Sequence, residues 1–443
     1  MPLAPPSRIT NRIVFSYALG SFGTGVFSTV PTVLLLYYCT VIMRIPASWA
    51  SAIVFLPKAW AIFWDPVVGA WSDRTESRLG RRRPFIAVGA AGVALAFVAL
   101  FAPPDFSTEQ AGAAWLGGAY FALATLYSLF AVPYIAIPPE VGLDSEARSR
   151  LVRWRIFVAM IGVLAGAAIA PLLISAGGGG KAGYAHMAVV LSIACGLAMI
   201  APLWMLRDFD RPRGAEERLA AHNTIVQQLR IALGYHRFVW LALSYLAMLT
   251  GAGALTAAAP YLIEQVLGRA DRDLGLALGA MLLVTTLTIP LWSALGRRFG
   301  DRLILACAAV AYGLLSVGLG LSVWARPSWT ATLLIFAALG APFAAAQVLP
   351  FTLLAHLIHE EVAKCTVAEG IFTGMWTAAE KVGLALGPGL LGLALAIWSH
   401  ARVTIPPFIG IVPVGLMLGA LIPLFISRSP AYANSLHGRH AHQ

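Results

Sequence analysis

Apolar residues dominate twelve long stretches of the chain. Ten of these stretches contain no Asp, Glu, Lys or Arg, and each reaches the roughly 20 residues that an α-helix needs to cross the hydrocarbon core of a bilayer. The other two are equally long but carry charges inside them. The pattern predicts an all-α membrane protein with twelve transmembrane helices. The expected spans lie near residues 13–43, 46–72, 84–104, 110–139, 156–180, 182–206, 238–263, 274–296, 303–325, 327–359, 367–398 and 403–427.

The composition and the placement of charge agree with this prediction. Hydrophobic residues make up 59% of the 443 residues, charged residues make up 12%, and the mean hydropathy is +0.78. Most of the 31 lysines and arginines fall in alternate loops, and cytoplasmic loops carry such an excess. We therefore expect a multi-pass protein of the cell inner membrane with both termini in the cytoplasm. Basic loops that face anionic lipid explain the net charge of +11, so no nucleic-acid partner is expected.

The chain also divides into two similar halves. The longest polar stretch follows the sixth span, and the loops after the second and eighth spans (residues 73–83 and 296–302) are both short and basic. We expect an N-terminal six-helix bundle at 1–206, a cytoplasmic linker at 207–237, a C-terminal six-helix bundle at 238–427 and a cytoplasmic tail at 428–443. Two six-helix halves are the architecture of the major facilitator superfamily of secondary transporters, whose substrate sites lie near the bilayer midplane.

Two motifs indicate a narrower family. Residues 65–75 read DPVVGAWSDRT and residues 80–85 read GRRRPF. This pair of motifs resembles the signature of the glycoside-pentoside-hexuronide:cation symporters, the melibiose permease group. The resemblance is good over about 13–90, patchy over about 131–155 and weak at Lys381. It implies cation-coupled symport of a sugar, a glycoside or a related small organic solute.

The resemblance also assigns residues to the coupling cation. Asp65 falls on an acidic position of the second span that binds the cation in that family, and Lys381 falls where the family has a lysine near the cation site. Three other acidic positions of the family are occupied here by Ala61, Gly25 and a residue near Ala131. A sodium site requires several oxygen ligands, whereas a proton requires only one carboxylate in a suitable environment. We therefore favour a proton over sodium as the coupling ion.

The residues of the second span support a cation site independently. Lys58 and Asp65 are seven residues apart, about two helical turns, and so lie on nearly the same face. A charge inside the bilayer costs roughly 2.5–3.5 kcal/mol on insertion scales, and such residues usually mark an ion pathway. The alternatives are a structural ion pair or, for Lys58, a side chain that extends to the interface. Our preferred hypothesis pairs Lys381 with Asp65.

Several polar and aromatic residues are candidates for binding the solute. One face of the first span carries a polar stripe of hydroxyl groups, formed by Tyr17, Ser21, Thr24, Ser28 and Thr32. These hydroxyl groups could instead form hydrogen bonds between helices. The two neighbouring tryptophans of the second span could stack on a sugar ring, or serve only in packing. The predicted substrate-binding residues are Tyr17, Ser21, Thr24, Ser28, Trp60, Trp64, Thr377 and Gln347.

The basic loop after the second span is predicted to gate the cytoplasmic side. Asp73, Arg74, Arg81 and Arg82 could pair with neighbouring helix ends, although the loop could also serve only to fix the topology. The sequence contains no convincing cluster of residues for catalysis, metal binding or a cofactor other than the coupling ion, H⁺ or Na⁺. We expect a monomeric secondary transporter and no enzyme. The main alternative function is a carrier or exporter of an amphipathic, lipid-like solute.

Overall fold

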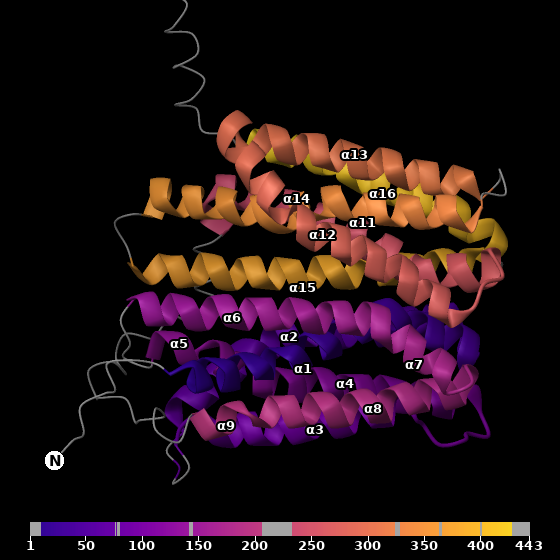
Figure 1. The fold of residues 1–443 in the computed structure, drawn as a ribbon, viewed down its shortest axis with the longest axis horizontal. Helices are drawn as coiled ribbons and strands as arrows, with labels where there is room; N and C mark the ends of the chain where they lie inside the picture. The colour runs from indigo at the N-terminus through magenta and orange to yellow at the C-terminus, as the bar shows by residue number, and fades with distance from the viewer. Residues whose placement is uncertain are drawn as a thin grey trace, which may run out of the picture. The chain divides into compact units, whose positions relative to one another are not determined.

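The computed structural model describes residues 10–75, 77, 80–140, 145–205, 233–323, 328–362, 366–398 and 401–427, and all regular structure in these ranges is helical (Figure 1). Most of the predicted linker at 207–237 and the whole tail at 428–443 lie outside the described residues. The predicted domain boundaries therefore stay a prediction.

Within the described residues, twelve helices are long and apolar enough to cross a membrane, and each coincides with one of the predicted spans. This confirms the all-α, twelve-span fold. The described elements are α1 (Asn11–Tyr37), η1 (Tyr38–Ile42), α2 (Ala47–Arg74), α3 (Arg83–Phe101), α4 (Glu109–Ile135), α5 (Ile137–Glu140), α6 (Ser145–Leu164), η2 (Ala165–Ile169), α7 (Ala170–Ala176), α8 (Gly180–Ile200), α9 (Pro202–Met205), α11 (His236–Pro260), η4 (Tyr261–Val266), α12 (Asp271–Phe299), α13 (Asp301–Ser322), α14 (Trp329–Val362), α15 (Thr366–Ile397) and α16 (Ala401–Ile426), where η marks a π-helical turn.

The chain forms two compact units. The first comprises residues 1–221, 259–279 and 395–397, and the second comprises 222–258, 280–394 and 398–443. In the first unit, α1 packs against α6 and α8, and α3 packs against α4 (Figure 1). In the second unit, α13 packs against α14 and α16. The long helices α11 and α12 contribute one end to the first unit and the rest to the second.

Glycines allow the closest helix contacts within each unit. A Cβ atom on Gly25 of α1 would lie 2.4 Å from the carbonyl oxygen of Ala159 on α6, and one on Gly387 of α15 would lie 2.3 Å from the backbone nitrogen of Ala254 on α11. No side chain fits at either position. In lipid, the hydrophobic effect does not drive helices together, and helix association depends on close packing. Small residues favour this packing because they let two backbones approach closely.

The helix of the fifth span begins well before the hydrophobic stretch that predicts it. The fifth span was expected to begin at residue 156, yet α6 begins at Ser145 and includes Arg150, Arg153 and Arg155. These arginines therefore lie on a helix and not in a loop. Hydropathy identifies only the part of a helix inside the bilayer, whereas Ala, Glu and Arg are good helix formers that continue the helix into water.

Candidate functional site

Two ionisable side chains occupy the interior of the second span. Lys58 and Asp65 are both half-buried on α2, inside the candidate membrane span Ala47–Arg74. The Lys58 ammonium nitrogen donates a hydrogen bond of 2.9 Å to Thr32 Oγ1 on α1. One carboxylate oxygen of Asp65 is completely buried. The side chain of Lys58 is therefore held inside the unit, and this argues against its extending to the interface.

The Lys58 contact continues along the first helix. Thr32 Oγ1 donates to the carbonyl oxygen of Ser28 at 2.7 Å, so the Thr32 hydroxyl accepts from Lys58 and donates within α1. A hydroxyl can fill both roles at once because it carries one donor and two lone pairs. Sequence analysis placed Thr32 on the polar stripe but did not identify it as the partner of Lys58.

The structure separates the two tryptophans of α2 from this charged face. Trp60 Nε1 donates to Thr125 Oγ1, and Trp64 Nε1 donates to the Thr125 carbonyl oxygen, both at 3.2 Å. The two indoles stack at 5.6 Å between ring centroids. Both are therefore directed towards α4, about half a turn away from Lys58 on the helix. A role of Trp60 and Trp64 in substrate binding stays a prediction.

The first part of the polar stripe on α1 is buried against α4. The Tyr17 hydroxyl donates to the carbonyl oxygen of Tyr134 at 3.0 Å, and the Tyr134 hydroxyl hydrogen-bonds Ser21 Oγ at 2.8 Å. Tyr17, Ser21 and Tyr134 are each at most 1% exposed. This arrangement favours the structural alternative for Tyr17 and Ser21, namely hydrogen bonding between helices. Sequence analysis missed Tyr134, because nothing local distinguishes it from other membrane tyrosines.

The middle of the stripe is more accessible. Thr24 is half-buried and Ser28 is exposed, and each hydroxyl donates back to a carbonyl oxygen of its own helix, Ser21 at 2.9 Å and Gly25 at 3.0 Å. Such back-bonding leaves the hydroxyl lone pairs free to accept from a ligand. These two residues are the members of the stripe that could still contact a solute.

The remaining predicted residues lie in the second unit. On α15, Lys381 is half-buried and Thr377 is exposed, and on α14 Gln347 is half-buried. A Cβ atom on Gly374, which shares a face with Lys381, would meet open space. Lys381 belongs to the second unit and Asp65 to the first. Their pairing stays a prediction.

An aromatic cluster in the second unit was not predicted. The rings of Tyr245 on α11 and Trp376 on α15 stack with centroids 4.5 Å apart and planes 7° apart. Phe351 packs against both at 5.8 and 5.9 Å. The Tyr245 hydroxyl and Trp376 Nε1 are buried without a hydrogen-bond partner among the described residues. Glu380, one turn further along α15, acts electrostatically on Tyr245. Two unused donors in an aromatic setting could serve a ligand.

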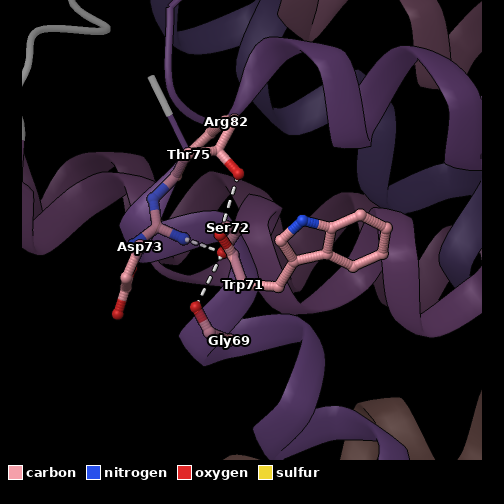
Figure 2. Close-up of polar contacts among 6 residues, drawn as sticks. All are labelled: Gly69, Trp71, Ser72, Asp73, Thr75 and Arg82. Carbon is pink, nitrogen blue, oxygen red and sulfur yellow. Dashed lines mark hydrogen bonds and ion pairs between the residues drawn. The ribbon is translucent and has the colours of Figure 1, made fainter. Parts of the chain in front are cut away.

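The loop between α2 and α3 is held by an ion pair. Arg82 Nη2 contacts Asp73 Oδ1 at 2.8 Å, and Arg82 Nη1 donates to Ser72 Oγ at 3.3 Å (Figure 2). Arg82 is 4% exposed and Ser72 is fully buried. Ser72 Oγ donates in turn to the Gly69 carbonyl oxygen at 3.0 Å. The last turn of α2 is thereby tied to the start of α3.

The other two predicted gating residues differ from each other. Arg81 is buried, at 6% exposure, whereas Arg74 is exposed at the end of α2. Burial of a guanidinium requires polar neighbours, so Arg81 belongs with Arg82 in the packed part of the loop. Arg74 is exposed, which fits the alternative that the loop serves only to fix the topology. The predicted gating function itself stays a prediction.

The fold and these intramembrane charges define a class of protein, the multi-pass membrane transporters. A family model described as MFS/sugar transport protein matches residues 16–407, and the chain belongs to this family. It is therefore a secondary transporter of the major facilitator superfamily and no enzyme. The resemblance identified from residues 65–85 is confirmed at the level of the family.

Known proteins add the following similarities. A putative glycoside/cation symporter of Escherichia coli is 30% identical over 42% of this chain and 41% of its own length. The sodium-dependent lysophosphatidylcholine symporter 1 of Mus musculus is 25% identical over 85% of this chain and 78% of its own length. The crystal structure of a D-xylose-proton symporter superposes with a TM-score of 0.67 at 16% identity, over 92% of this chain and 96% of that one.

Proposed function

We propose that this protein is a cation-coupled symporter of a sugar, a glycoside or a related small organic solute, with the proton as coupling ion. One observation carries the proposal. A single face of α2 presents Lys58, fixed to α1 through Thr32, and Asp65, with a buried carboxylate oxygen, both inside a membrane span. Ionisable groups at such depth are retained for function by default, because their burial is costly.

The two residues have separate roles in this proposal. Asp65 accepts and releases the coupling proton, since a single carboxylate suffices for that. Lys58 contributes a fixed positive charge two helical turns away, held by its hydrogen bond to Thr32. Lys381 is the proposed counterpart in the second unit. The similarity to a putative glycoside/cation symporter supports both the coupling and the solute class.

A lipid-like, amphipathic solute is the second candidate. The stacked Tyr245 and Trp376, with Phe351 beside them and Glu380 nearby, offer an apolar aromatic setting with two unused donors. Aromatic faces bind cationic groups such as quaternary ammonium, and a carboxylate strengthens that preference. The relative named as a lysophosphatidylcholine symporter supports this candidate.

Uptake into proteoliposomes tests the proposal and separates the two candidates. The solutes are a panel of labelled mono- and disaccharides and lysophosphatidylcholine, each under an imposed proton or sodium gradient. We expect proton-driven accumulation of one sugar, abolished in Asp65→Asn. Glu109→Gln is the matched control, because Glu109 is an exposed carboxylate in the first turn of α4. Accumulation of lysophosphatidylcholine alone would replace the sugar proposal, and equal uptake by Asp65→Asn would remove Asp65 from the coupling mechanism.

The location and assembly complete the proposal. We infer a location in the cell inner membrane with both termini in the cytoplasm, since alternate loops carry most of the 31 basic residues. The proposal of a monomer rests on the family resemblance alone. A reporter that is active only in the cytoplasm, fused after Gln443, checks the orientation. An inactive reporter on a well-expressed fusion would show that the C-terminus lies on the opposite side of the membrane from the one proposed.

A further inference from the structure

One side of α6 in the first unit is accessible and changes from basic to apolar along the helix. The membrane span that contains α6 begins at Arg150. Further along the same side lie Arg153, Trp154, Phe157 and Ile161, because residues three, four and seven positions apart share a face of a helix. Arg150 is half-buried, Arg153 is exposed, and the last three side chains are between 44% and 57% exposed. We call these residues the α6 stripe.

A different face of α6 packs against α1 and leaves the stripe uncovered by that helix. Leu151 and Val158 are buried on the packed face. A Cβ atom on Gly162 would lie 2.3 Å from the carbonyl oxygen of Phe22 on α1, so the two backbones are in direct contact there. The stripe therefore belongs to the surface of the first unit and is accessible to a ligand.

The basic end of the stripe adjoins the first turn of α1. Arg150 Nη2 donates a hydrogen bond to Asn11 Oδ1, which brings the start of α1 beside this part of α6. A guanidinium carries five N–H donors, so Arg150 keeps donors for a further acceptor. Arg12, the next residue of α1, is exposed. Arg12, Arg150 and Arg153 together make this end of the first unit strongly basic.

The two helices supply little negative charge to balance these arginines. The chain contains no Asp or Glu before Asp65, and none from Ala147 to Arg207. Within its bounds, α6 carries four arginines and one acid. Basic residues at the end of a membrane span attract anionic lipid headgroups. A guanidinium also matches a phosphate group geometrically, since it can donate two parallel N–H bonds to it. The charge therefore favours an anion that carries a phosphate.

The order of residues along the stripe matches the order of groups in a phospholipid. Because an α-helix rises 1.5 Å per residue, Trp154 lies about 6 Å, and Phe157 about 10 Å, further along the span than Arg150. The headgroup layer is roughly 5–7 Å thick on each side of the hydrocarbon. The arginines are thus at headgroup depth and Phe157 is at the depth of the acyl chains. Trp154 lies between them, at the depth that tryptophan prefers.

The aromatic part of the stripe has a defined geometry. The Trp154 and Phe157 rings meet edge to face, with centroids 5.7 Å apart and planes at 88°. The two rings therefore present a fixed apolar surface directly beyond Arg153. A soluble phosphate would leave this surface unused, whereas the acyl chains of a lipid would cover it.

We propose that the α6 stripe, together with Arg12, binds an anionic phospholipid of the surrounding bilayer. The arginines hold the phosphate of the headgroup, and Trp154, Phe157 and Ile161 contact its acyl chains. A zwitterionic phospholipid is disfavoured, because it brings a positive group towards the arginines. In the proposed topology this end of α6 lies at the cytoplasmic leaflet, where anionic lipids attract basic segments. The binding itself depends neither on that topology nor on the proposed transport function.

Native mass spectrometry of the purified full-length protein tests the site. Dioleoyl-phosphatidylglycerol is titrated into the detergent-solubilised protein, and dioleoyl-phosphatidylcholine serves as the zwitterionic comparison. We expect the wild type to bind phosphatidylglycerol more tightly than phosphatidylcholine. The apparent affinity for phosphatidylglycerol is expected to fall about fivefold in Arg153→Gln and about 25-fold when Arg150→Gln is added. Equal affinity of the wild type for the two lipids would overturn the proposal.

Arg44→Gln is the matched control for the loss of charge. Arg44 is an exposed arginine that follows the first span, at the end opposite to Arg12. We expect its replacement to leave the affinity for phosphatidylglycerol unchanged. The proposal fails if the double variant of Arg150 and Arg153 binds phosphatidylglycerol as the wild type does, or if Arg44→Gln weakens binding equally. Monodisperse elution in detergent verifies that each variant folds.

A fluorescence measurement locates the lipid on the stripe. Phosphatidylglycerol with brominated acyl chains quenches the fluorescence of tryptophans that it contacts. We expect less quenching in Trp154→Phe than in the wild type, and a similar decrease in the double variant of Arg150 and Arg153. Quenching that is unchanged in both would overturn the proposal. A wild-type dimer that Phe157→Ala separates in the mass spectra would assign the stripe to a second copy of the chain and would likewise overturn it.

Discussion

The basic loops of the two units are alike in sequence but are anchored differently. In the first unit, the loop between α2 and α3 is closed by the ion pair of Arg82 with Asp73 at 2.8 Å. In the second unit, Arg302 at the start of α13 donates to the carbonyl oxygens of Leu424 and Ser427 at 2.7 and 3.0 Å, at the end of α16. It also donates to Ser427 Oγ at 2.6 Å.

The aspartates of the two loops also have different hydrogen-bond partners. Asp73 accepts from an arginine, whereas Asp301 accepts from the Thr352 hydroxyl of α14 at 3.1 Å. The first loop therefore depends on attraction between two full charges. The second depends on a cation at a helix C-terminus, where the helix dipole favours positive charge, and on neutral donors and acceptors. We infer that the first loop is the one suited to open and close, because an ion pair can exchange its partner for water.

The largest expected effect is that of breaking the ion pair. Arg82→Gln removes the buried guanidinium and its 2.8 Å contact with Asp73, whose side chain is 35% exposed, so we expect a loss of about 2 kcal/mol, the contribution of a charge-assisted hydrogen bond. The measurement is the free energy of unfolding in a detergent titration. The exchange of charges, Arg82→Asp with Asp73→Arg, is expected to recover part of this loss. No recovery in the double variant would mean that the pair itself contributes little.

A smaller effect is expected for the cap of α16. Arg302→Gln loses charge-assisted hydrogen bonds to Leu424 and Ser427 at a half-exposed site, which corresponds to about 1.5 kcal/mol. We expect the initial uptake rate, corrected for the amount of folded protein, to be unchanged, whereas Arg82→Gln alters it. If Arg302→Gln alters that rate as strongly as Arg82→Gln, the functional distinction between the two loops is wrong.

The sequence predicts the spans well because a membrane helix is determined locally. A continuous run of about 20 apolar residues has few alternatives in a bilayer. The depth of Lys58 and Asp65 follows from the same local pattern, and so does their shared face on α2. In the structure, Lys58 and Asp65 are half-buried positions within a span, as predicted.

The partners of these side chains could not be predicted from one sequence. The contacts of Lys58 with Thr32 and of Tyr17 with Tyr134 join residues on different helices, and helical spacing gives no information about which helices meet. The same limit applies to the two basic loops, whose similar motifs do not show that their anchoring differs.

The smallest expected effect concerns the acid of the second loop. Thr352→Val removes the hydroxyl that donates to Asp301 Oδ2 at 3.1 Å and to the Leu349 carbonyl oxygen at 2.8 Å. Asp301 is only half-buried and can accept from water instead, so we expect a loss of about 0.5–1 kcal/mol in the free energy of unfolding. Thr352→Ser keeps the hydroxyl and serves as the control. A loss as large as that of Arg82→Gln would show that Asp301 anchors its loop as strongly as Asp73 does, and the contrast between a charged and a neutral attachment would no longer hold.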